Sequence, residues 1–312
     1  MRFVVSGGTG FIGSPLAEVY AEEGHDVRVL TRGLPDGEAR HDPGTGKPGI
    51  TRVGWRPSGA AGPWASVVDD ADAVINLAGE SLGDKRWTPQ RKAVLHDSRI
   101  LPARSLVDAI RKAAKPPRVF INSSAVGYYG PSGAEPKTES APAGKTFLAN
   151  LAEEWESEAR QAESSGARVV LLRTGLVLEK TGGALPRMMR PFRYFVGGPI
   201  GSGRQYMSWI HRLDIVEMIR WIIETPGVVG PVNGTAPHPV TNREFARALA
   251  RALRRPSLVP APAFALKAMF GEMAEPLLLT GQRVIPAKAQ SHGYHFRYPE
   301  IDIAMRGIFG EG

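Results

Sequence analysis

The sequence predicts an α/β fold built on a doubly wound parallel sheet, with a smaller and mostly helical C-terminal region. Two observations predict it. Over the first two-thirds of the 312-residue chain, short β-branched apolar runs alternate with longer amphipathic stretches, which is the pattern of βαβ units. A run of glycines at Gly7–Gly13 then joins the first apolar run directly to the first amphipathic stretch, giving the order strand, tight turn, helix.

Six apolar runs are the expected strands of this sheet. Continuous runs such as Val-Phe-Ile and Val-Val-Leu-Leu suit strands that helices cover on both faces. The strands are expected at Arg2–Ser6, Asp26–Thr31, Thr51–Trp55, Ala73–Leu77, Arg118–Ser123 and Arg168–Arg173. The helices between them are expected at Ile12–Glu23, Pro89–Ala114 and Phe147–Ser164. The polar segment Arg32–Ile50, rich in Gly and Pro, is expected to be a surface loop.

Beyond the sixth strand, glycines and prolines break the chain into shorter segments. A helix is expected over Asp214–Glu224 and a strand over Gly230–Gly234. Thr241, with Glu244 three residues later, is a helix start and predicts a helix within Val240–Leu253. We therefore expect a sheet domain of residues 1–178, to which residues 206–236 return, and a substrate-side C-terminal region of residues 179–205 and 237–312.

The composition excludes several kinds of chemistry. Hydrophobic residues make up 42% of the chain, which is enough for a large core, and cysteine is missing. Disulfides, thiolate metal sites and cysteine nucleophiles are therefore excluded. No His, Asp or Glu cluster has metal-ligand spacing, so no metal is expected. No run of about 18 apolar residues is present, so we expect a cytoplasmic protein without a membrane partner.

The charge balance favours an anionic partner of small size. The chain carries 39 Lys and Arg against 31 Asp and Glu, a net charge of +8, which attracts anions in general. The basic residues are scattered and form no known nucleic-acid motif, so no nucleic acid is expected. A small-molecule substrate with an anionic group is expected instead, and a homodimer is compatible with the sequence.

The glycine-rich turn predicts a dinucleotide site. The turn fits both spacings of the phosphate-binding pattern. The spacing G-x-x-G-x-x-G is met by Gly7, Gly10 and Gly13, and the spacing G-x-G-x-x-G by Gly8, Gly10 and Gly13. One glycine permits the tight turn, one lets the backbone approach a pyrophosphate, and one allows close helix–strand packing. The helix N-terminus that follows offers free N–H groups to the phosphates. The alternative is a glycine turn without a ligand.

The end of the second strand favours NADP(H) over NAD. An acidic residue there would hold the ribose 2′-hydroxyl, whereas an arginine suits a 2′-phosphate. The strand ends with Thr31 and Arg32, and Asp26 stands at its start, far from the cofactor end. Thr31 would donate its hydroxyl and Arg32 its guanidinium to the 2′-phosphate. The alternative is that Arg32 is a solvated surface residue.

Several further motifs resemble one protein family. The chain has Asn76-Leu77-Ala78-Gly79-Glu80-Ser81 after the fourth strand, Asn122–Gly130 after the fifth, Arg173–Leu178, Ser208-Trp209-Ile210-His211 and Val232–Pro237. Together with the glycine turn they resemble the atypical extended short-chain dehydrogenase/reductases, in the NAD(P)-dependent epimerase/dehydratase-like, cell-division-inhibitor-like branch. The residues after Ala263 resemble that branch's small terminal domain. The resemblance covers nearly the whole chain and implies a Rossmann-type fold.

The resemblance also implies a set of cofactor contacts and a catalytic group. The residues expected to bind the cofactor are Gly7, Thr9, Gly10, Phe11, Ile12, Gly13, Thr31, Arg32, Leu77, Ala78, Gly79 and Ser123. Members of the family use a Ser or Thr with a Tyr and a Lys four residues apart. Ser124 would fill the first role, with Ser123 as the alternative. Phe147 and Leu151 stand where the Tyr and Lys are expected, and a phenyl ring transfers no proton.

Other side chains are candidates for the missing proton donor. Tyr128, in the loop after Ser124, would reach a substrate with its phenol, or else packs that loop. Glu80 lies where ligands bind in open α/β sheets and would act as a base, or else pairs with Lys85 or Arg86. Arg86, Arg91 and Arg99 would bind an anionic substrate, or else form an exposed helix face. Asp214 resembles a structural residue at the family's substrate-side helix start.

Two functions are compatible with these residues. One is an NADP(H)-dependent oxidoreductase or epimerase that acts on a carbonyl or hydroxyl group, with Ser124, Tyr128 and Glu80 as catalytic candidates. The other is a catalytically silent NADP(H) sensor that regulates a partner, which the missing Tyr and Lys favour.

Overall fold

The computed structural model describes residues 1–41 and 49–310. Eight strands form the central sheet, in the order β12, β8, β6, β5, β1, β2, β4 and β3. Their bounds are β1 Arg2–Ser6, β2 Asp26–Thr31, β3 Ala39–His41, β4 Ile50–Gly54, β5 Ala73–Asn76, β6 Val119–Ala125, β8 Arg168–Thr174 and β12 Gly230–Gly234. All neighbours are parallel except β3, which runs antiparallel to β4. The predicted doubly wound parallel sheet is confirmed.

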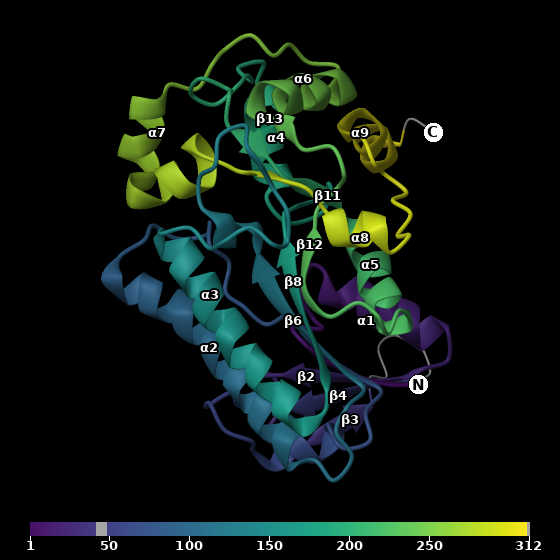
Figure 1. Cartoon of the computed structure of the whole chain (residues 1–312). Coiled ribbons are helices and arrows are strands. Elements are labelled where there is room, and N and C mark those ends of the chain that lie inside the picture. The colour runs from purple at the N-terminus through teal and green to yellow at the C-terminus, as the bar shows by residue number, and fades with distance from the viewer. Residues whose placement is uncertain (42–48, 311–312) are drawn as a thin grey trace.

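Helices cover both faces of this sheet, as Figure 1 shows. The helices α2 (Pro89–Lys112) and α3 (Phe147–Arg160) lie on one face, and α1 (Gly13–Glu22) and α5 (Arg212–Glu224) on the other. Neighbouring residues of a strand belong to different cores, because successive side chains point to opposite faces. Within β1, Val5 packs in the core with α1 and α5, whereas Val4 packs with α2 and α3. This explains the uninterrupted apolar runs of the sequence.

A third core holds the C-terminal region together. It contains Phe192, Trp209, Phe245, Ile301 and Met305, among others. The helices of the region are α4 Leu185–Arg193, α6 Asn242–Leu253, α7 Ala263–Phe270, α8 Ala287–Ser291 and α9 Ile301–Phe309. Three two-stranded sheets join them to the rest: β9 Leu176–Leu178 with β11 Trp209–His211, β10 Tyr206–Met207 with β13 Val240–Thr241, and β7 Pro136–Lys137 with β14 Arg283–Val284.

The start of α6 follows the predicted capping pattern. The Thr241 side chain accepts a hydrogen bond from the Glu244 N–H, and the Glu244 carboxylate accepts one from the Thr241 N–H at 2.7 Å. These bonds satisfy donors that a helix end leaves open. The strand predicted over Gly230–Gly234 is also present, as β12, and it pairs with β8. Where the domain boundaries fall stays a prediction.

One prediction about local structure is wrong. The segment Arg32–Ile50 was expected to be a loop, but its described part contains β3, which pairs with β4 through Ala39–Val53 and His41–Thr51. All three residues of β3 are exposed, so this edge strand has no alternation of buried and exposed side chains that a sequence pattern would reveal. Residues 42–48 of the predicted loop lie outside the described residues.

Candidate functional site

The glycine turn between β1 and α1 leaves no room for side chains. Gly7 has a φ of +70°, and a Cβ on it would lie 2.6 Å from the backbone carbonyl of Leu77. A Cβ on Gly13 would lie 2.3 Å from the Gly7 oxygen and 2.7 Å from the Cα of Gly8. The Gly10 N–H closes the turn on the Gly7 oxygen at 2.9 Å. The turn therefore needs glycine at these positions, as the sequence predicts for a phosphate-binding loop.

The residues around this turn leave the N-terminus of α1 open. Thr9 and Gly10 are exposed, and Ile12, which precedes α1, offers no side-chain cap. In the first helical turn the Ser14 N–H donates to the Gly10 carbonyl at 2.9 Å and Pro15 has no N–H, so among the described residues of that turn the Gly13 N–H is the donor left to bind an anion. The Phe11 ring packs toward the loop after β9, where a Cβ on Gly182 would lie 2.6 Å from it.

A buried hydrogen-bonded chain joins the carboxyl ends of β1, β5 and β6. The Ser6 hydroxyl donates to the Asn76 Oδ1 at 2.6 Å, and the Asn76 Nδ2 donates to the Asn122 Oδ1, also at 2.6 Å. The Asn122 amide donates onward to the Ser123 carbonyl at 2.8 Å, and the Ala78 N–H donates to Asn76 Oδ1 at 3.3 Å. Ser6, Asn76 and Asn122 are fully buried. They fix the floor of the crevice where ligands bind in such sheets.

The end of β2 presents a cation to this crevice. The Arg32 side chain is 73% exposed, and one of its nitrogens lies 3.9 Å from a carboxylate oxygen of Glu80 on the other side of the crevice. The Arg32 carbonyl accepts a hydrogen bond from the Arg56 guanidinium at 2.8 Å. The Thr31 hydroxyl oxygen accepts a bond from the Gly33 N–H at 3.2 Å. The guanidinium of Arg32 is therefore held loosely, whereas its backbone is fixed.

Glu80 is paired with cations, but its partners are Arg91 and Arg32 and not the expected Lys85 or Arg86. Its carboxylate accepts a hydrogen bond from Arg91 at 3.3 Å in addition to the contact with Arg32. Its backbone carbonyl accepts a bond from Arg99 at 2.9 Å. The guanidinium of Arg99 also lies against Gly79, at 3.5 Å from where a Cβ would stand. Burial, and then the charge of Arg91, lower the pKa of Arg99 to about 10, which leaves it charged at neutral pH.

The predicted cationic group of Arg86, Arg91 and Arg99 is divided by the fold. Arg91 and Arg99 lie beside Glu80, whereas Arg86 donates to the Ala268 carbonyl at 2.7 Å and so reaches α7. All three guanidinium groups donate to backbone carbonyls. They hold the loop after β5 in place as well as making it positive.

A buried ion pair between β8 and α3 contacts the end of β6. Arg173 on β8 donates from Nε and Nη2 to the two carboxylate oxygens of Glu156 on α3, each at 2.7 Å, and both side chains are almost completely buried. The Ser124 hydroxyl donates to the same carboxylate at 2.7 Å. Burial disfavours the charged guanidinium, but the hydrogen bonds and charge of Glu156 outweigh it and raise the pKa of Arg173. Ser124 therefore contacts the ion pair with its hydroxyl.

The same arginine holds two tyrosines. The Arg173 guanidinium lies 3.5 Å from the centre of the Tyr128 ring and donates to the Tyr129 hydroxyl at 3.0 Å. The Tyr129 hydroxyl in turn donates to Asn233 on β12 at 2.6 Å. Burial raises the pKa of Tyr129 to about 12, although Arg173 and Asn233 favour its ionised form. In the described part of the chain the Tyr128 hydroxyl makes no hydrogen bond, so this phenol is available to a ligand. Glu156 and Arg173 each belong to a motif that resembles the family, but the sequence did not predict that they form part of the site.

Apolar side chains occupy the two positions where the family's Tyr and Lys are expected, and the Lys92 Nζ lies 5.1 Å from the centre of the Phe147 ring. The Phe147 ring stands edge-on to Trp87, with 5.4 Å between centroids. Leu151 is buried against Ile100 and Trp155, in the contact between α2 and α3. Neither position holds a group that transfers a proton.

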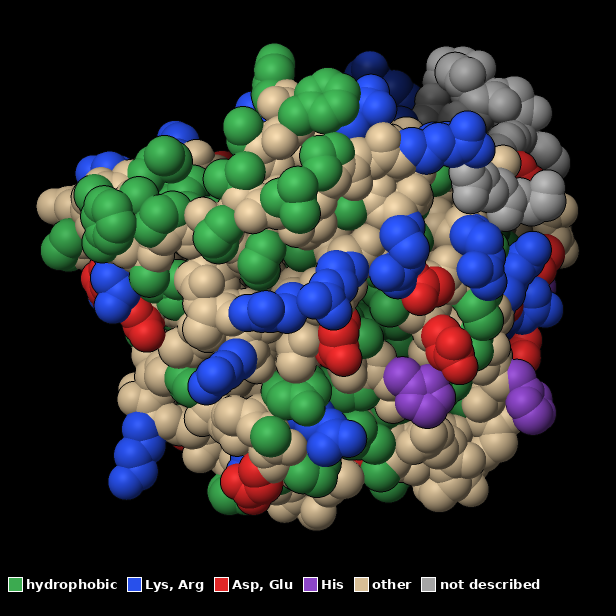
Figure 2. Space-filling view, turned by 90° about the horizontal axis from the view of Figure 1, so that it is seen from above, with side chains coloured by type: hydrophobic (Ala, Val, Ile, Leu, Met, Phe, Trp, Pro, Cys, Tyr) green, Lys and Arg blue, Asp and Glu red, His purple; other side chains and the backbone are tan. Residues whose placement is uncertain are grey.

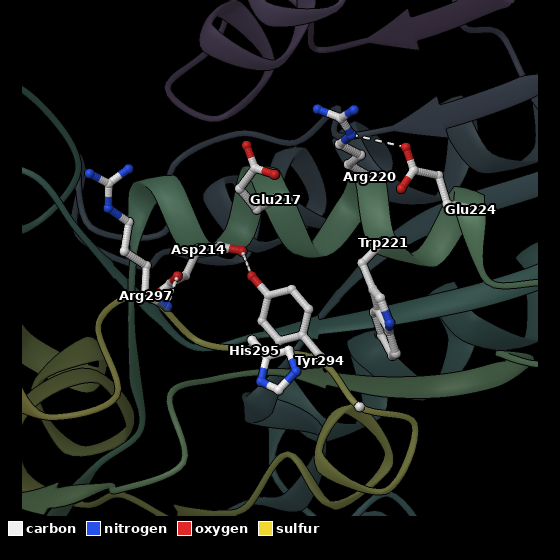
Figure 3. Close-up of a pocket in the computed structure, with 9 residues that line it drawn as sticks. Asp214, Glu217, Arg220, Trp221, Glu224, Tyr294, His295 and Arg297 are labelled. Carbon is white, nitrogen blue, oxygen red and sulfur yellow. Dashed lines mark hydrogen bonds and ion pairs between the residues drawn. The ribbon is translucent and has the colours of Figure 1, made fainter.

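The start of α5 is a structural site. His211 caps the helix, because its Nδ1 accepts a hydrogen bond from the Leu213 N–H at 3.0 Å, and burial lowers its pKa to about 4. The Asp214 carboxylate accepts bonds from the N–H groups of Arg297 and Tyr298 at 2.8 and 3.0 Å. Figure 3 shows Asp214 at one end of an open cavity of about 380 Å³ between α5 and residues 293–297. Burial raises the pKa of Asp214.

The described residues form neither a metal site nor a membrane-spanning helix. No three His, Asp or Glu side chains come together there as metal ligands would. No helix of that part of the chain combines the length and apolar composition that crossing a bilayer requires.

Comparisons with known proteins agree with this architecture. A family model described as "NAD dependent epimerase/dehydratase family" matches residues 3–233, and one described as "Domain of unknown function (DUF1731)" matches residues 261–308. The Arabidopsis thaliana "Epimerase family protein SDR39U1 homolog, chloroplastic" is 40% identical over 310 residues, 99% of this chain and 86% of its own length. The Bacillus subtilis "Epimerase family protein YfhF" is 38% identical over 312 residues, 100% of this chain and 99% of its own length.

A solved structure is similar over its full length. The crystal structure of human epimerase family protein SDR39U1 (isoform2) with NADPH superposes with a TM-score of 0.87 at 36% sequence identity, covering 99% of each chain. The similarity therefore includes the central sheet and the C-terminal region alike.

Proposed function

The chain belongs to the NAD-dependent epimerase/dehydratase family, and on that premise we propose that it binds NADP(H) in the crevice at the carboxyl ends of β1, β2 and β5. The observation that carries the proposal is the side-chain-free turn, in which a Cβ on Gly7 or Gly13 would meet backbone at 2.6 or 2.3 Å. Such a turn suits a pyrophosphate. The residues proposed to hold it are Gly7, Thr9, Gly10, Phe11, Ile12 and Gly13.

The proposed preference for the 2′-phosphorylated cofactor depends on Arg32. Its guanidinium is 73% exposed, and its ion-pair contact with Glu80 spans 3.9 Å. An exposed pair of this kind contributes little, so a phosphate would displace it at small cost. Thr31 adds a hydroxyl. Leu77, Ala78, Gly79 and Ser123 would line the rest of the crevice. The human relative whose structure contains NADPH supports this preference.

When bound, the nicotinamide supplies hydride transfer to or from a carbonyl or hydroxyl carbon. Among this chain's own residues we propose Tyr128 as the group that moves the accompanying proton, because its phenol is free and its ring is held by Arg173 at 3.5 Å. Ser124 was predicted to bind the reacting oxygen. Its hydroxyl donates to Glu156 at 2.7 Å, so we propose that it acts as a positioning residue through the ion pair. Glu80 pairs with both Arg32 and Arg91, so its single negative charge offsets theirs only in part.

The binding proposal is tested by comparing NADPH with NADH. Arg–phosphate hydrogen bonds contribute roughly 1.5–3 kcal/mol, and exposure places Arg32 at the lower end. We therefore expect NADPH to bind about tenfold tighter than NADH, and Arg32→Ala to remove most of that difference without changing the affinity for NADH. Arg40→Ala is the matched control, because Arg40 is an exposed arginine on β3 that pairs with Glu38. Equal affinities of the two cofactors for the parent chain would refute the 2′-phosphate contact.

A second function is favoured by the apolar packing of Phe147 and Leu151. It is a cofactor sensor that performs no chemistry and regulates a partner. NADPH oxidation with a panel of carbonyl compounds separates the two. Turnover that Tyr128→Phe lowers at least tenfold, while NADPH affinity stays the same, supports the enzyme. NADPH binding without oxidation across the panel, together with a partner whose capture requires NADPH, supports the sensor.

A further inference from the structure

The positive charge of the chain is concentrated in two segments of the C-terminal region. Residues 185–204, which hold α4, and residues 242–270, which hold α6 and α7, contain ten Lys and Arg but a single Asp or Glu, a net charge of +9. The whole chain carries +8. Arg187, Arg251 and Lys267 pair with acidic residues outside the two segments. The remainder of the molecule is nearly neutral.

Most of the large apolar side chains that the fold leaves exposed lie in the same two segments. Leu258 is 81% exposed, and Tyr194 and Phe264 are each 78% exposed. The complete set in these segments is Tyr194, Phe195, Val196, Leu258, Val259, Phe264 and Met269. Only four other described residues of this kind are exposed, and they are dispersed along the chain. Large exposed apolar groups that gather in one place mark an interaction surface.

The two segments form one surface, which we name the basic apolar face. The N–H groups of Leu258 and Val259 both donate to the Gly197 carbonyl. The Arg255 guanidinium lies 4.6 Å from the centre of the Phe195 ring. Ala261 then forms an isolated β-bridge with Ile200, and α7 begins two residues later. Figure 2 views the molecule from the side of α4, α6 and α7, and hydrophobic side chains gather over this end, most densely at the left, where α7 lies.

We propose that the basic apolar face docks on the surface of an anionic lipid bilayer. Its apolar side chains would enter the interface, and its arginines would contact the lipid phosphates. These side chains are 48–81% exposed, so they project into solvent, as insertion requires. A second copy of the chain would bring two positive faces together, which repulsion disfavours. The expectation of no membrane partner rested on the missing membrane span, and docking of this kind needs none.

The test is co-sedimentation of the full chain with phosphatidylcholine vesicles, with and without phosphatidylserine. Each cation near an anionic surface contributes about fivefold in affinity. We expect binding to the phosphatidylserine vesicles at least tenfold tighter than to the neutral ones. Binding should weaken as salt shortens the Debye length from about 10 Å at 0.1 M to about 3 Å at 1 M.

Two double variants test the two parts of the face. Leu258→Ser with Phe264→Ser removes apolar groups, and Arg190→Gln with Arg193→Gln removes charge. Each is expected to weaken binding at least tenfold, and the exposure of these residues predicts an unchanged melting temperature. The matched controls are Val94→Ser with Val229→Ser, also exposed, and Arg111→Gln with Lys112→Gln at the end of α2. Both controls should bind as the parent does.

Three results would overturn the proposal. The first is no binding to phosphatidylserine vesicles at low salt, and the second is equal loss in the test and control variants. The third is a dimer in analytical ultracentrifugation that the Leu258 and Phe264 substitutions dissociate, which would assign the face to a second copy of the chain. None of these measurements uses the cofactor, so they are independent of the proposed NADP(H) site.

Discussion

Replacing Glu156 with leucine would leave the charge of Arg173 buried without a partner. The Glu156 carboxylate accepts three hydrogen bonds of 2.7 Å, two from Arg173 and one from Ser124. The side chains of the pair are only 2% and 4% exposed, so solvent cannot replace these bonds. Removing one partner of such a pair costs about 3–5 kcal/mol. Because a folded domain is stable by roughly 5–15 kcal/mol in total, Glu156→Leu should lower the free energy of unfolding by about a fifth or more.

Urea unfolding followed by circular dichroism measures this loss. Glu153→Leu is the matched control, since Glu153 is an exposed glutamate on the same helix, and it should change the free energy of unfolding by less than about 0.5 kcal/mol. Adding Arg173→Met to Glu156→Leu removes the unpaired charge and should recover part of the stability. A loss below about 1 kcal/mol in Glu156→Leu would contradict the assignment of a buried, mutually dependent pair.

Two further predictions concern pH and the glycine turn. The pKa of His211 is about 4 in the folded chain against 6.5 in the unfolded chain. Its contribution to the free energy of unfolding is therefore complete above pH 6.5, and about 3 kcal/mol of stability is lost as the pH falls toward 4. His211→Asn keeps an acceptor for the Leu213 N–H but does not titrate in this range. Its melting temperature should therefore fall less between pH 6.5 and 4.5 than that of the parent chain, and parallel curves of melting temperature against pH would contradict this. Gly13→Ala should weaken NADPH binding at least tenfold and lower the melting temperature, because its Cβ meets backbone at 2.3 Å. The control is Gly227→Ala, where a Cβ meets nothing within 4 Å, and it should change neither the NADPH affinity nor the melting temperature. Equal NADPH affinities of the two variants would show that the turn is dispensable for binding.

The sequence predicts those parts of the fold whose signals are local. The turn at Gly7–Gly13 and the start of α6 each occupy a few consecutive residues, and each has a spacing that few other structures require. The edge strand β3 escapes such reasoning because its three residues are all exposed. Burial alternation, on which strand prediction depends, is missing there.

The candidate site was predicted only where its residues form motifs. Asn76 and Asn122 belong to recognisable strand-end motifs, although their hydrogen bond to each other follows only from the sheet order. Glu156 stands among Glu153, Glu154 and Glu158 on α3, and although Trp155-Glu156 resembles a family motif, that motif does not indicate which residue the carboxylate contacts. Only the placement of α3 over β8 brings it to Arg173. Long-range pairing of this kind needs the tertiary structure.

The position of β12 has a consequence for how this protein is made. β12 lies beside β8, but its residues 230–234 come more than fifty positions later in the chain. During synthesis β8 therefore emerges before its neighbour exists and exposes the backbone groups of an unpaired edge, which is a template for aggregation. A fragment truncated near residue 178 would keep that edge permanently. Expression of residues 1–178 alone should therefore give insoluble material, and any dissection of the protein needs to retain the chain through Gly234.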